Sequence, residues 1–424
     1  MTVRERIDLL VEQGRLTPEE RDTLAGSGSV VGLEQANQMI ENVIGVLELP
    51  IGLGIHFLIN GRERVVPMAV EEPSIVAAAS HVARIVQACG GYEATSSEPV
   101  MIAQLQVIGA GDAEAARDAL LIRRGELLAA ANAIQPNLVR RGGGARDIEV
   151  RLLADDRPEL SARYKVQVVV HLLVDCRDAM GANLLNSMAE GIAPLVEEIT
   201  GGRVLLRILS NLADRRTARA TVRIPAEKLA FKHYDGDTVM NNIVEAARLA
   251  ELDPYRAATH NKGIMNAVDA VCMASGNDWR AQEAGAHAFA ARTGHYGPLT
   301  TWRAVDGALE GSIELPVQVG TVGAQIQGHP IVRIMHKLLD VQGAADLGQI
   351  MACAGLGQNL AALKALATEG IQSGHMARHA RAVAFSAGVP APRVEEVSQL
   401  LIESGDIKVW KAQEILAALE KESV

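Results

Sequence analysis

The chain has 424 residues, of which 48% are hydrophobic and 3% aromatic, and its formal net charge is −10. This length predicts about two to three domains with buried cores. The acidic, aromatic-poor composition argues against a nucleic-acid-binding surface and against stacking platforms for single strands or sugars. We therefore expect an Ala- and Gly-rich interior and a small-molecule site.

The cysteines and the apolar runs exclude further classes of protein. The four cysteines are widely separated and lack zinc-ligand or redox spacing, so we expect no metal and no disulfide framework. The most apolar stretch, residues 43–59, is interrupted by Glu48, Pro50 and His56, and falls short of the roughly eighteen apolar residues of a membrane span. Because the N-terminus is charged and amphipathic, we expect a cytoplasmic protein without a signal peptide.

The first hundred residues predict short helices, then a hairpin, then a longer helix. Thr17-Pro18-Glu19-Glu20 is typical of a capped helix with Pro at its first position, within a helical arm over residues 1–25. Two strand-like runs, 55–60 and 64–70, follow and are joined by Gly61-Arg62. Residues 74–91 then have the pattern of a helix that stops at a pair of glycines.

Residues 98–214 have an alternation of their own. Strand-like and helical runs follow one another in the order β-α-β-β-α-β, which is the ferredoxin-like split βαβ arrangement. The strands are expected at 100–110, 146–155, 164–175 and 203–210, and the helices at 112–134 and 182–200. We expect an inserted domain with an antiparallel sheet, not a Rossmann unit.

The remaining chain returns to longer mixed segments and ends in helices. A long helix is expected over 345–370, and two more over 393–405 and 409–422. The predicted class is α+β. The expected units are a large domain (1–97 and 215–371), an inserted small domain (98–214) and a helical C-terminal flap (372–424).

Two glycine motifs follow strands and precede helices. Gly109-Ala110-Gly111 begins like a dinucleotide fingerprint, but Glu114 replaces the third glycine and would repel a pyrophosphate, so we expect a tight turn. Residues 178–183, Asp-Ala-Met-Gly-Ala-Asn, lead into a helix whose free N–H groups and dipole favour an anion. A simple capped helix entry is the alternative at the second motif.

Several polar residues in apolar surroundings are candidates for chemistry. Glu71 and Glu72 precede a helix, where they either complement its N-terminus or provide an acid shielded by apolar neighbours. Lys262 either stabilises an oxyanion or is an exposed loop lysine, and Asp278 is either its partner or a turn residue. His375 opens the C-terminal appendage as a structural residue or a hinge-borne proton donor. Together these types suggest carbonyl reduction.

Six motifs occur in one order and carry a family resemblance. They are Glu41 to Gly45, residues 70–80, residues 178–183, residues 253–266, Gly276 to Trp279 and residues 374–381. In this order they closely resemble 3-hydroxy-3-methylglutaryl-coenzyme A (HMG-CoA) reductase of the bacterial, class II type. The resemblance extends from about residue 31 to the end of the chain.

The resemblance implies a reaction and its catalytic residues. HMG-CoA is reduced by two successive hydride transfers from NAD(P)H, through a mevaldyl-CoA hemithioacetal and mevaldehyde, to mevalonate and CoA. Lys262 then stabilises charge on the carbonyl oxygen, and Asp278 keeps that lysine charged and oriented. Glu72 supplies a proton to the alkoxide, and His375 protonates the CoA thiolate as the flap closes.

The resemblance also implies binding residues and a partner. The substrate contacts match Ser74, Arg256, Asn261 and Asn266. The dinucleotide contacts match Asp178, Met180, Gly181, Ala182, Asn183 and Asn211. A homodimer is implied, with the CoA ester on one large domain and the dinucleotide on the small domain of its partner, and a larger oligomer is left open. No metal, nucleic acid or membrane is implied.

One departure concerns the choice of cofactor. NAD-specific members carry an Asp near the end of the first small-domain helix, where this chain has Gln135. Without that carboxylate, nothing at this position repels the 2′-phosphate of NADPH, and Arg140 and Arg141 lie nearby in sequence. A Gln side chain, however, also bonds the ribose hydroxyl of NADH. NADH and NADPH therefore both remain open. A non-catalytic acyl-CoA-binding relative of the same fold is the alternative function.

Overall fold

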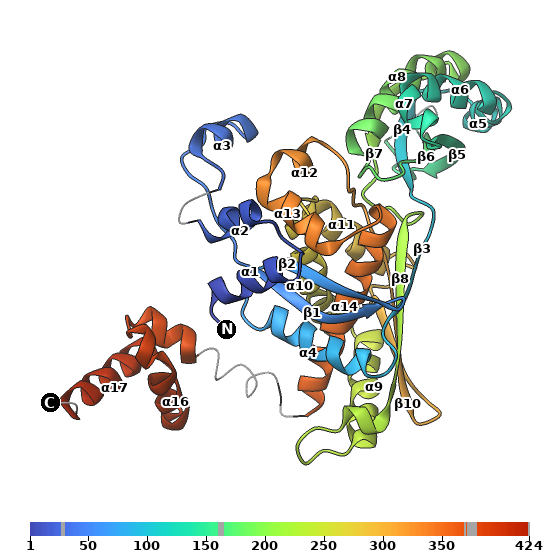
Figure 1. Cartoon of the computed structure of the whole chain (residues 1–424). Coiled ribbons are helices and arrows are strands. Elements are labelled where there is room, and N and C mark those ends of the chain that lie inside the picture. Colours follow the sequence, from blue (N-terminus) through green and yellow to red (C-terminus); the bar gives the residue numbers. More distant parts are fainter. Residues whose placement is uncertain (27–29, 160–164, 369, 371–379, 423–424) are drawn as a thin grey trace.

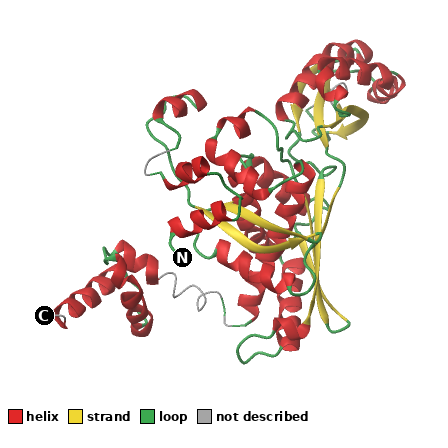
Figure 2. Ribbon diagram, in the orientation of Figure 1, coloured by secondary structure: helices red, strands yellow, loops and turns green. Residues whose placement is uncertain are grey.

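A computed structural model of the chain describes residues 1–26, 30–159, 165–368, 370 and 380–422. It is a mixed α/β structure in which every paired strand of the three sheets is antiparallel to its neighbours (Figures 1 and 2). This agrees with the expected class and differs from a doubly wound parallel sheet.

The N-terminal arm consists of α1 (Val3–Glu12), α2 (Pro18–Ala25) and α3 (Leu33–Met39). The first two helices begin with capping boxes, in which Thr2 and Thr17 bond reciprocally with Glu5 and Glu20. Apolar side chains of the arm pack on α13 (Pro330–Leu339) and on the end of β2 (Arg62–Ala69). The predicted helical arm is confirmed.

One large core joins elements from both ends of the chain. The hairpin of β1 (Ile51–Ile59) and β2 lies beside α4 (Ile75–Gln87), as predicted. A second sheet has the order β3-β8-β10-β9, from Glu93–Ser96, Thr217–Pro225, Ala308–Pro316 and Thr300–Val305. The helices around this core are α9 (Gly236–Leu252), α10 (Pro254–Ala274), α11 (Trp279–Ala290) and α14 (Ala344–Ala367), and the short α12 (Ala324–Gly328) contacts α13.

The long helix α14 is the central helix of this core. Its side chains are buried on nearly all sides for most of its length. Among the described helices it has the length and apolarity to cross a membrane, yet 72% of its most apolar window is buried inside the protein. Its hydrophobicity is that of a core helix, which must be apolar all round because it has no solvent-facing side.

A second, separate core lies within residues 101–213. The sheet order is β5-β6-β4-β7, from Gly144–Ala154, Val166–Asp175, Val100–Ile108 and Arg203–Leu209. The helices that pack against this sheet are α5 (Ala113–Ile122), α6 (Arg124–Ile134) and α8 (Ala182–Thr200), and the short α7 (Pro136–Arg140) follows α6. The single helix predicted over 112–134 was wrong, because the chain bends at Arg123, whose side chain pairs with Glu126 and Glu198.

The C-terminal helices form a third core of their own. The helices α16 (Val394–Ser404) and α17 (Val409–Glu422) pack around Ala380, Ala384 and neighbouring apolar residues. In Figure 1 these helices stand apart from the remaining chain. Both helices lie where the sequence predicts them.

Candidate active site

Glu72 and Lys262 meet although 190 positions separate them in the chain. Glu72 lies in the turn between β2 and α4, and Lys262 projects from the middle of α10. Lys262 Nζ donates to Glu72 Oε2 over 2.7 Å. The side chains are 61% (Lys262) and 41% (Glu72) exposed. The expectation that apolar sequence neighbours shield Glu72 was therefore wrong for a single chain, because this turn is at the surface.

Ser74 begins α4 in a strained conformation. Its φ of 84° is left-handed, which a residue with a Cβ rarely adopts outside turns and functional sites. The backbone must turn sharply here, because strand β2 ends at Ala69 and helix α4 starts at Ile75. Glu72 and Ser74 thus lie in one tight loop, from which Glu72 contacts Lys262.

Two further predicted substrate residues lie on α10. Asn266 is one helical turn after Lys262, so both side chains share a face of the helix. Arg256 is half-buried, and burial lowers the pKa of its guanidinium, which remains a cation. Within the described part of the chain, Arg256 forms no ion pair, so its charge is available to an anion.

Asn261 is not available as a substrate contact in this structure. Its side chain is fully buried, and its amide nitrogen donates to Tyr296 Oη and to the Gly297 carbonyl, each over 3.0 Å. Its oxygen accepts from Leu299 N over 2.9 Å. Both ends of the amide are thus occupied within the chain, and the predicted substrate role of Asn261 stays a prediction. Asn261 fixes the loop before β9 against α10.

Asp278 does not bond Lys262 within the chain. Its carboxylate caps α11 by accepting from Arg280 N and Ala281 N, and it pairs with the Arg280 side chain at 3.3 Å. Burial raises the pKa of Asp278, but the Ala281 amide and Arg280 together outweigh burial and leave it below its ordinary value. Within one chain Glu72, and not Asp278, pairs with Lys262, so the predicted orientation of Lys262 by Asp278 stays a prediction.

The geometry of α10 explains the separation. Twelve residues from Lys262 to Ala274 span about 18 Å of helix at about 1.5 Å per residue. After the helix ends, Asn277 N bonds back to Cys272 O over 2.9 Å, which keeps Asp278 at the C-terminal end. Lys262 and Asp278 therefore belong to opposite ends of one rigid element.

His375 lies outside the described residues. The last described part before it is the end of α14, which ends at Ala367. Asn242 Nδ2 donates to Ala367 O and Tyr234 Oη donates to Thr368 O, each over 3.1 Å. These bonds attach the end of α14 to the segment that leads into α9.

Residues 178–183 form the turn between β6 and α8. Gly181 has a φ of 110°, and an added Cβ would lie 2.8 Å from Cys176 Sγ, so only glycine fits there. Helix α8 starts at Ala182 without a side-chain cap, and Asn183 is exposed beside it. The first N–H groups of a 19-residue helix are thus open to an anion.

The turn over residues 178–183 is fixed by contacts with other segments that the sequence did not reveal. Asp178 Oδ1 accepts from Ala344 N over 2.9 Å at the start of α14. The buried guanidinium of Arg216 donates to the carbonyls of Ala179 and Met180. No motif marked Arg216, because its role depends on carbonyls that only the fold brings to it.

The remaining dinucleotide candidates lie at two other places on the small unit. Gln135 is at the junction of α6 and α7 and is half-buried. Asn211 is exposed after β7, and its carbonyl accepts from Gln318 Nε2 over 2.5 Å. The other glycine motif is a tight turn, as expected, because Asp112 caps α5 by accepting from Ala115 N.

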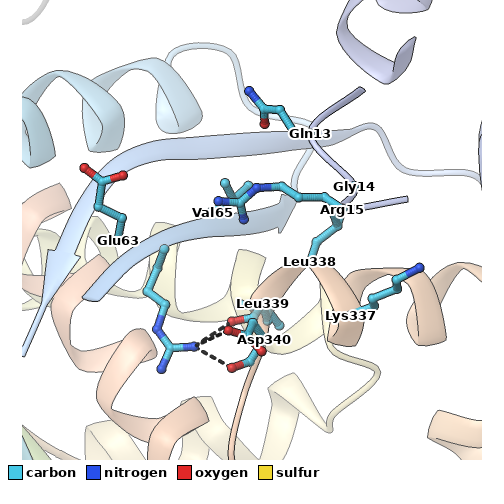
Figure 3. Close-up of a pocket in the computed structure, with 10 residues that line it drawn as sticks. Gln13, Gly14, Arg15, Glu63, Val65, Lys337, Leu338, Leu339 and Asp340 are labelled. Atoms are coloured by element: carbon cyan, nitrogen blue, oxygen red, sulfur yellow. Dashed lines mark hydrogen bonds and ion pairs between the residues drawn. The ribbon is translucent and has the colours of Figure 1, made fainter. Parts of the chain in front are cut away.

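A pocket of about 340 Å³ lies elsewhere, between the N-terminal arm, β2 and α13 (Figure 3). Figure 3 shows Arg15, Glu63, Lys337 and Asp340 around it. It contains none of the predicted site residues. Among the described residues no three His, Cys, Asp or Glu side chains are arranged to hold a metal, and all four cysteines are free.

Comparison with known proteins agrees with this arrangement. A family model described as hydroxymethylglutaryl-coenzyme A reductase matches residues 2–380. A 3-hydroxy-3-methylglutaryl-coenzyme A reductase of Archaeoglobus fulgidus is 44% identical over 99% of this chain and 93% of its own. A probable reductase of the same name from Borreliella burgdorferi is 36% identical over 80% and 76% of the two chains.

Solved structures agree as well. A 3-hydroxy-3-methylglutaryl-coenzyme A reductase of Streptococcus pneumoniae superposes with a TM-score of 0.83 and 39% identity, over 99% of this chain and 98% of its own. A class II 3-hydroxy-3-methylglutaryl-CoA reductase of the same species, bound to NADPH in open conformations, superposes with a TM-score of 0.82 and 40% identity. The match covers 87% of this chain and 98% of that chain. The chain therefore belongs to the hydroxymethylglutaryl-coenzyme A reductase family.

Proposed function

We propose that this protein interconverts HMG-CoA and mevalonate plus CoA, using two molecules of NAD(P)H. The observation that carries the proposal is the pairing of Lys262 with Glu72, 2.7 Å apart, beside the strained Ser74 turn. A cation and a carboxyl in contact provide both charge stabilisation and a proton for a carbonyl that becomes an alkoxide. Family membership supports this chemistry over simple CoA-ester binding.

Each residue has a defined task in the two hydride transfers. Lys262 stabilises the oxyanion that forms when hydride reaches the thioester carbonyl, and again when it reaches the aldehyde. Glu72, already bonded to Lys262, delivers a proton to that oxygen. Arg256 grips the free carboxylate of the glutaryl group, and Ser74 and Asn266 bind the rest of it. His375 protonates the CoA thiolate as the C-terminal flap, residues 372–424, closes.

We infer that Asp278 acts in the site of the other copy. Asp278 cannot reach Lys262 of its own chain, because about 18 Å of α10 separates the two ends. Its neighbour Asn277 instead bonds Gly320, in the segment after β10, and the next residue of that segment, Thr321, bonds Asp178 O. One chain therefore brings Glu72 and Lys262, and Asp278 of the partner subunit arrives together with the partner's dinucleotide loop.

A homodimer also accounts for an exposed apolar segment. Residues 44–55, between α3 and the middle of β1, include Ile44 and Leu47, which are 101% and 89% exposed. Val46, Leu49, Ile51 and Ile55 of the same segment are also exposed. A contiguous apolar surface of this kind is typical of a protein–protein interface. A second copy that covers it would complete the site and bury these side chains.

We infer that residues 98–214 are a dinucleotide-binding domain of the ferredoxin-like type. Its strand order β5-β6-β4-β7 and its own core support this assignment. The pyrophosphate is expected at the uncapped start of α8, with Met180, Gly181, Ala182 and Asn183 around it. Asn211 is expected at the domain boundary. Asp178 contributes mainly by capping α14, since one of its oxygens is already bonded there.

We propose NADPH as the preferred cofactor. Gln135, where a ribose-binding carboxylate is absent, leads directly into α7 and then a turn rich in arginine. Arg146 and Arg177 both donate to the Gly142 carbonyl in this turn, and Asp175 pairs with both of them. The positive charge that supports the proposal is therefore that of Arg140 and Arg141, and the absence of a carboxylate at Gln135 favours a 2′-phosphate.

The experiment is an assay of the purified protein with HMG-CoA and each reduced cofactor, followed by nicotinamide absorbance. We expect oxidation of NADPH and, in reverse, reduction of NADP⁺ with mevalonate and CoA. Calorimetric binding of HMG-CoA without turnover in either direction would support the non-catalytic relative instead. We expect the enzyme to act in the cytoplasm, since its most apolar helix, α14, is part of the core.

A further inference from the structure

Arg216 is a buried cation whose side-chain hydrogen bonds all go to backbone carbonyls. Its side chain is 4% exposed. Nη1 donates to Ala179 O and Met180 O over 2.9 and 3.3 Å, and Nη2 donates to Arg177 O and Val319 O over 3.4 and 2.6 Å. A buried guanidinium is costly unless its N–H groups are bonded, so this arrangement is specific rather than incidental.

These bonds determine which way the loop after β6 presents its backbone. The carbonyls of residues 177, 179 and 180 point back to Arg216, so the following N–H groups, from Gly181 into α8, face the other way. That is the direction in which α8 offers its uncapped N-terminus. The fork of Arg216 thus pre-orients the donors that an anionic cofactor needs, and its charge adds to the potential there.

The same guanidinium connects the loop to a second segment, residues 316–321. Val319 O accepts from Arg216, and Thr321 N donates to Asp178 O over 2.9 Å. Gly320 is clamped on its other side by Asn277, whose Oδ1 accepts from Gly320 N at 2.7 Å and whose Nδ2 donates to Gly320 O at 3.1 Å. Asn277 directly precedes Asp278.

We propose that Arg216 and Asn277 are positioning residues that fasten the dinucleotide loop and the Asp278 turn into one rigid unit. Through this unit the cofactor and Asp278 reach the opposite subunit in a fixed relative position. The proposal rests on the assignment of residues 178–183 to dinucleotide binding. Neither residue touches the cofactor, so each acts through the backbone it holds.

The test is dinucleotide affinity, measured by fluorescence titration of NADPH with wild type, Arg216→Met and Arg216→Lys. We expect Arg216→Met to weaken NADPH binding by about tenfold or more, because four backbone carbonyls lose their donor. The KM for HMG-CoA should stay within about twofold, since its site is on α4 and α10. Arg216→Lys keeps the charge but not the fork, so we expect it to be impaired nearly as much.

Asn277→Ala provides a second route if Arg216→Met does not fold, which a thermal melt will reveal. It should weaken NADPH binding and lower kcat together, because it frees both Gly320 and the Asp278 turn. The matched control is Arg219→Met, which removes an exposed arginine of β8, the strand that begins directly after Arg216, and should bind NADPH normally.

The outcomes of these measurements distinguish failure of the positioning proposal from failure of the proposed function. Normal NADPH affinity in folded Arg216→Met, or in Asn277→Ala, overturns the positioning proposal. Wild-type affinity in Arg216→Lys also overturns it, because charge alone would then suffice. If wild type neither binds a dinucleotide nor turns over HMG-CoA, the proposed function itself fails.

Discussion

Lys262 and Asp278 lie at opposite ends of α10, and Lys262 contacts Glu72 while Asp278 caps α11. Both residues are expected to serve one reaction, yet a straight helix keeps them apart within the chain. A helix cannot shorten, so a reaction that uses both residues needs a second copy of the chain. This is the basis for our proposal that the site is divided between two copies.

This division predicts complementation between two inactive variants. Lys262→Ala and Asp278→Ala should each be nearly inactive alone. When the two are mixed under conditions that exchange subunits, heterodimers contain one intact site, and about a quarter of wild-type activity should return. Activity of the mixture is measured against each variant incubated alone. If mixing restores nothing although heterodimers form, Asp278 does not act across the interface.

Lys262 itself should be needed for turnover but not for folding. Lys262→Ala is expected to lower kcat by about 10²–10³-fold or more, the scale of losing one preorganised oxyanion stabiliser. Its melting temperature should be unchanged, because the side chain is 61% exposed and an exposed ion pair contributes little stability. Lys232→Ala, also on the surface, is the control. Near-normal kcat in Lys262→Ala would reject its catalytic role.

Gly320→Ala should displace the dinucleotide loop. A Cβ at this position would lie 2.6 Å from Met180 N and 3.0 Å from Asp178 O, and neither backbone atom can move without the loop. We expect a higher KM for NADPH and a lower melting temperature, with the KM for HMG-CoA nearly unchanged. Gly125→Ala on α6, where a Cβ meets nothing within 4 Å, is the matched control. Equal KM values for NADPH in both variants would show that the loop has room.

Cofactor preference should respond to Gln135. Gln135→Asp introduces a carboxylate that repels a 2′-phosphate and bonds a ribose 2′-hydroxyl. We expect the ratio of kcat/KM for NADPH over NADH to fall by about tenfold, which is about 1.4 kcal/mol of discrimination. Gln135→Glu tests whether the length of the side chain matters. An unchanged ratio in both variants would place the discriminating contact elsewhere.

A buried carboxyl pair should make stability depend on pH. Burial and the neighbouring Glu283 raise the pKa of Asp269 to about 9 from the ordinary 3.8. His287, 2.7 Å from Glu283, lowers the pKa of that second carboxyl. Asp269 therefore keeps its proton in the folded protein and shares it with ionised Glu283, while the unfolded chain ionises near pH 4.

The sign follows from proton linkage. The contribution of Asp269 is fully present below about pH 4 and is lost between about pH 4 and 9, at up to about 1.4 kcal/mol per pH unit. Asp269→Asn does not titrate and can still donate to Glu283. The stability of this variant relative to wild type should therefore rise with pH, as measured by denaturant unfolding at several pH values. A constant difference would mean that Asp269 is not protonated in the folded state.

Local signals in the sequence predicted most of the elements. Capping residues such as Thr17 and Glu20, and alternating apolar residues on β4 and β6, are properties of neighbouring positions and do not depend on the fold. The interruption between helices α5 and α6 at Arg123 was missed. The Arg123 side chain pairs there with Glu198 of α8, a contact that is not visible in the local sequence. The strands β8, β9 and β10 were not assigned individually, although β8 and β10 have nine residues each.

Motifs in the sequence alone also determined the family and marked Glu72, Lys262 and the loop over 178–183 as candidates for the site, because these depend on residue types in a fixed order. Only the tertiary structure decided how they work together. It paired Lys262 with Glu72, occupied Asn261 in a buried loop and assigned Arg216 to the dinucleotide loop. These relationships depend on distances between segments far apart in the chain, and the length of α10 is the reason for our proposal that Asp278 of the partner subunit completes the site.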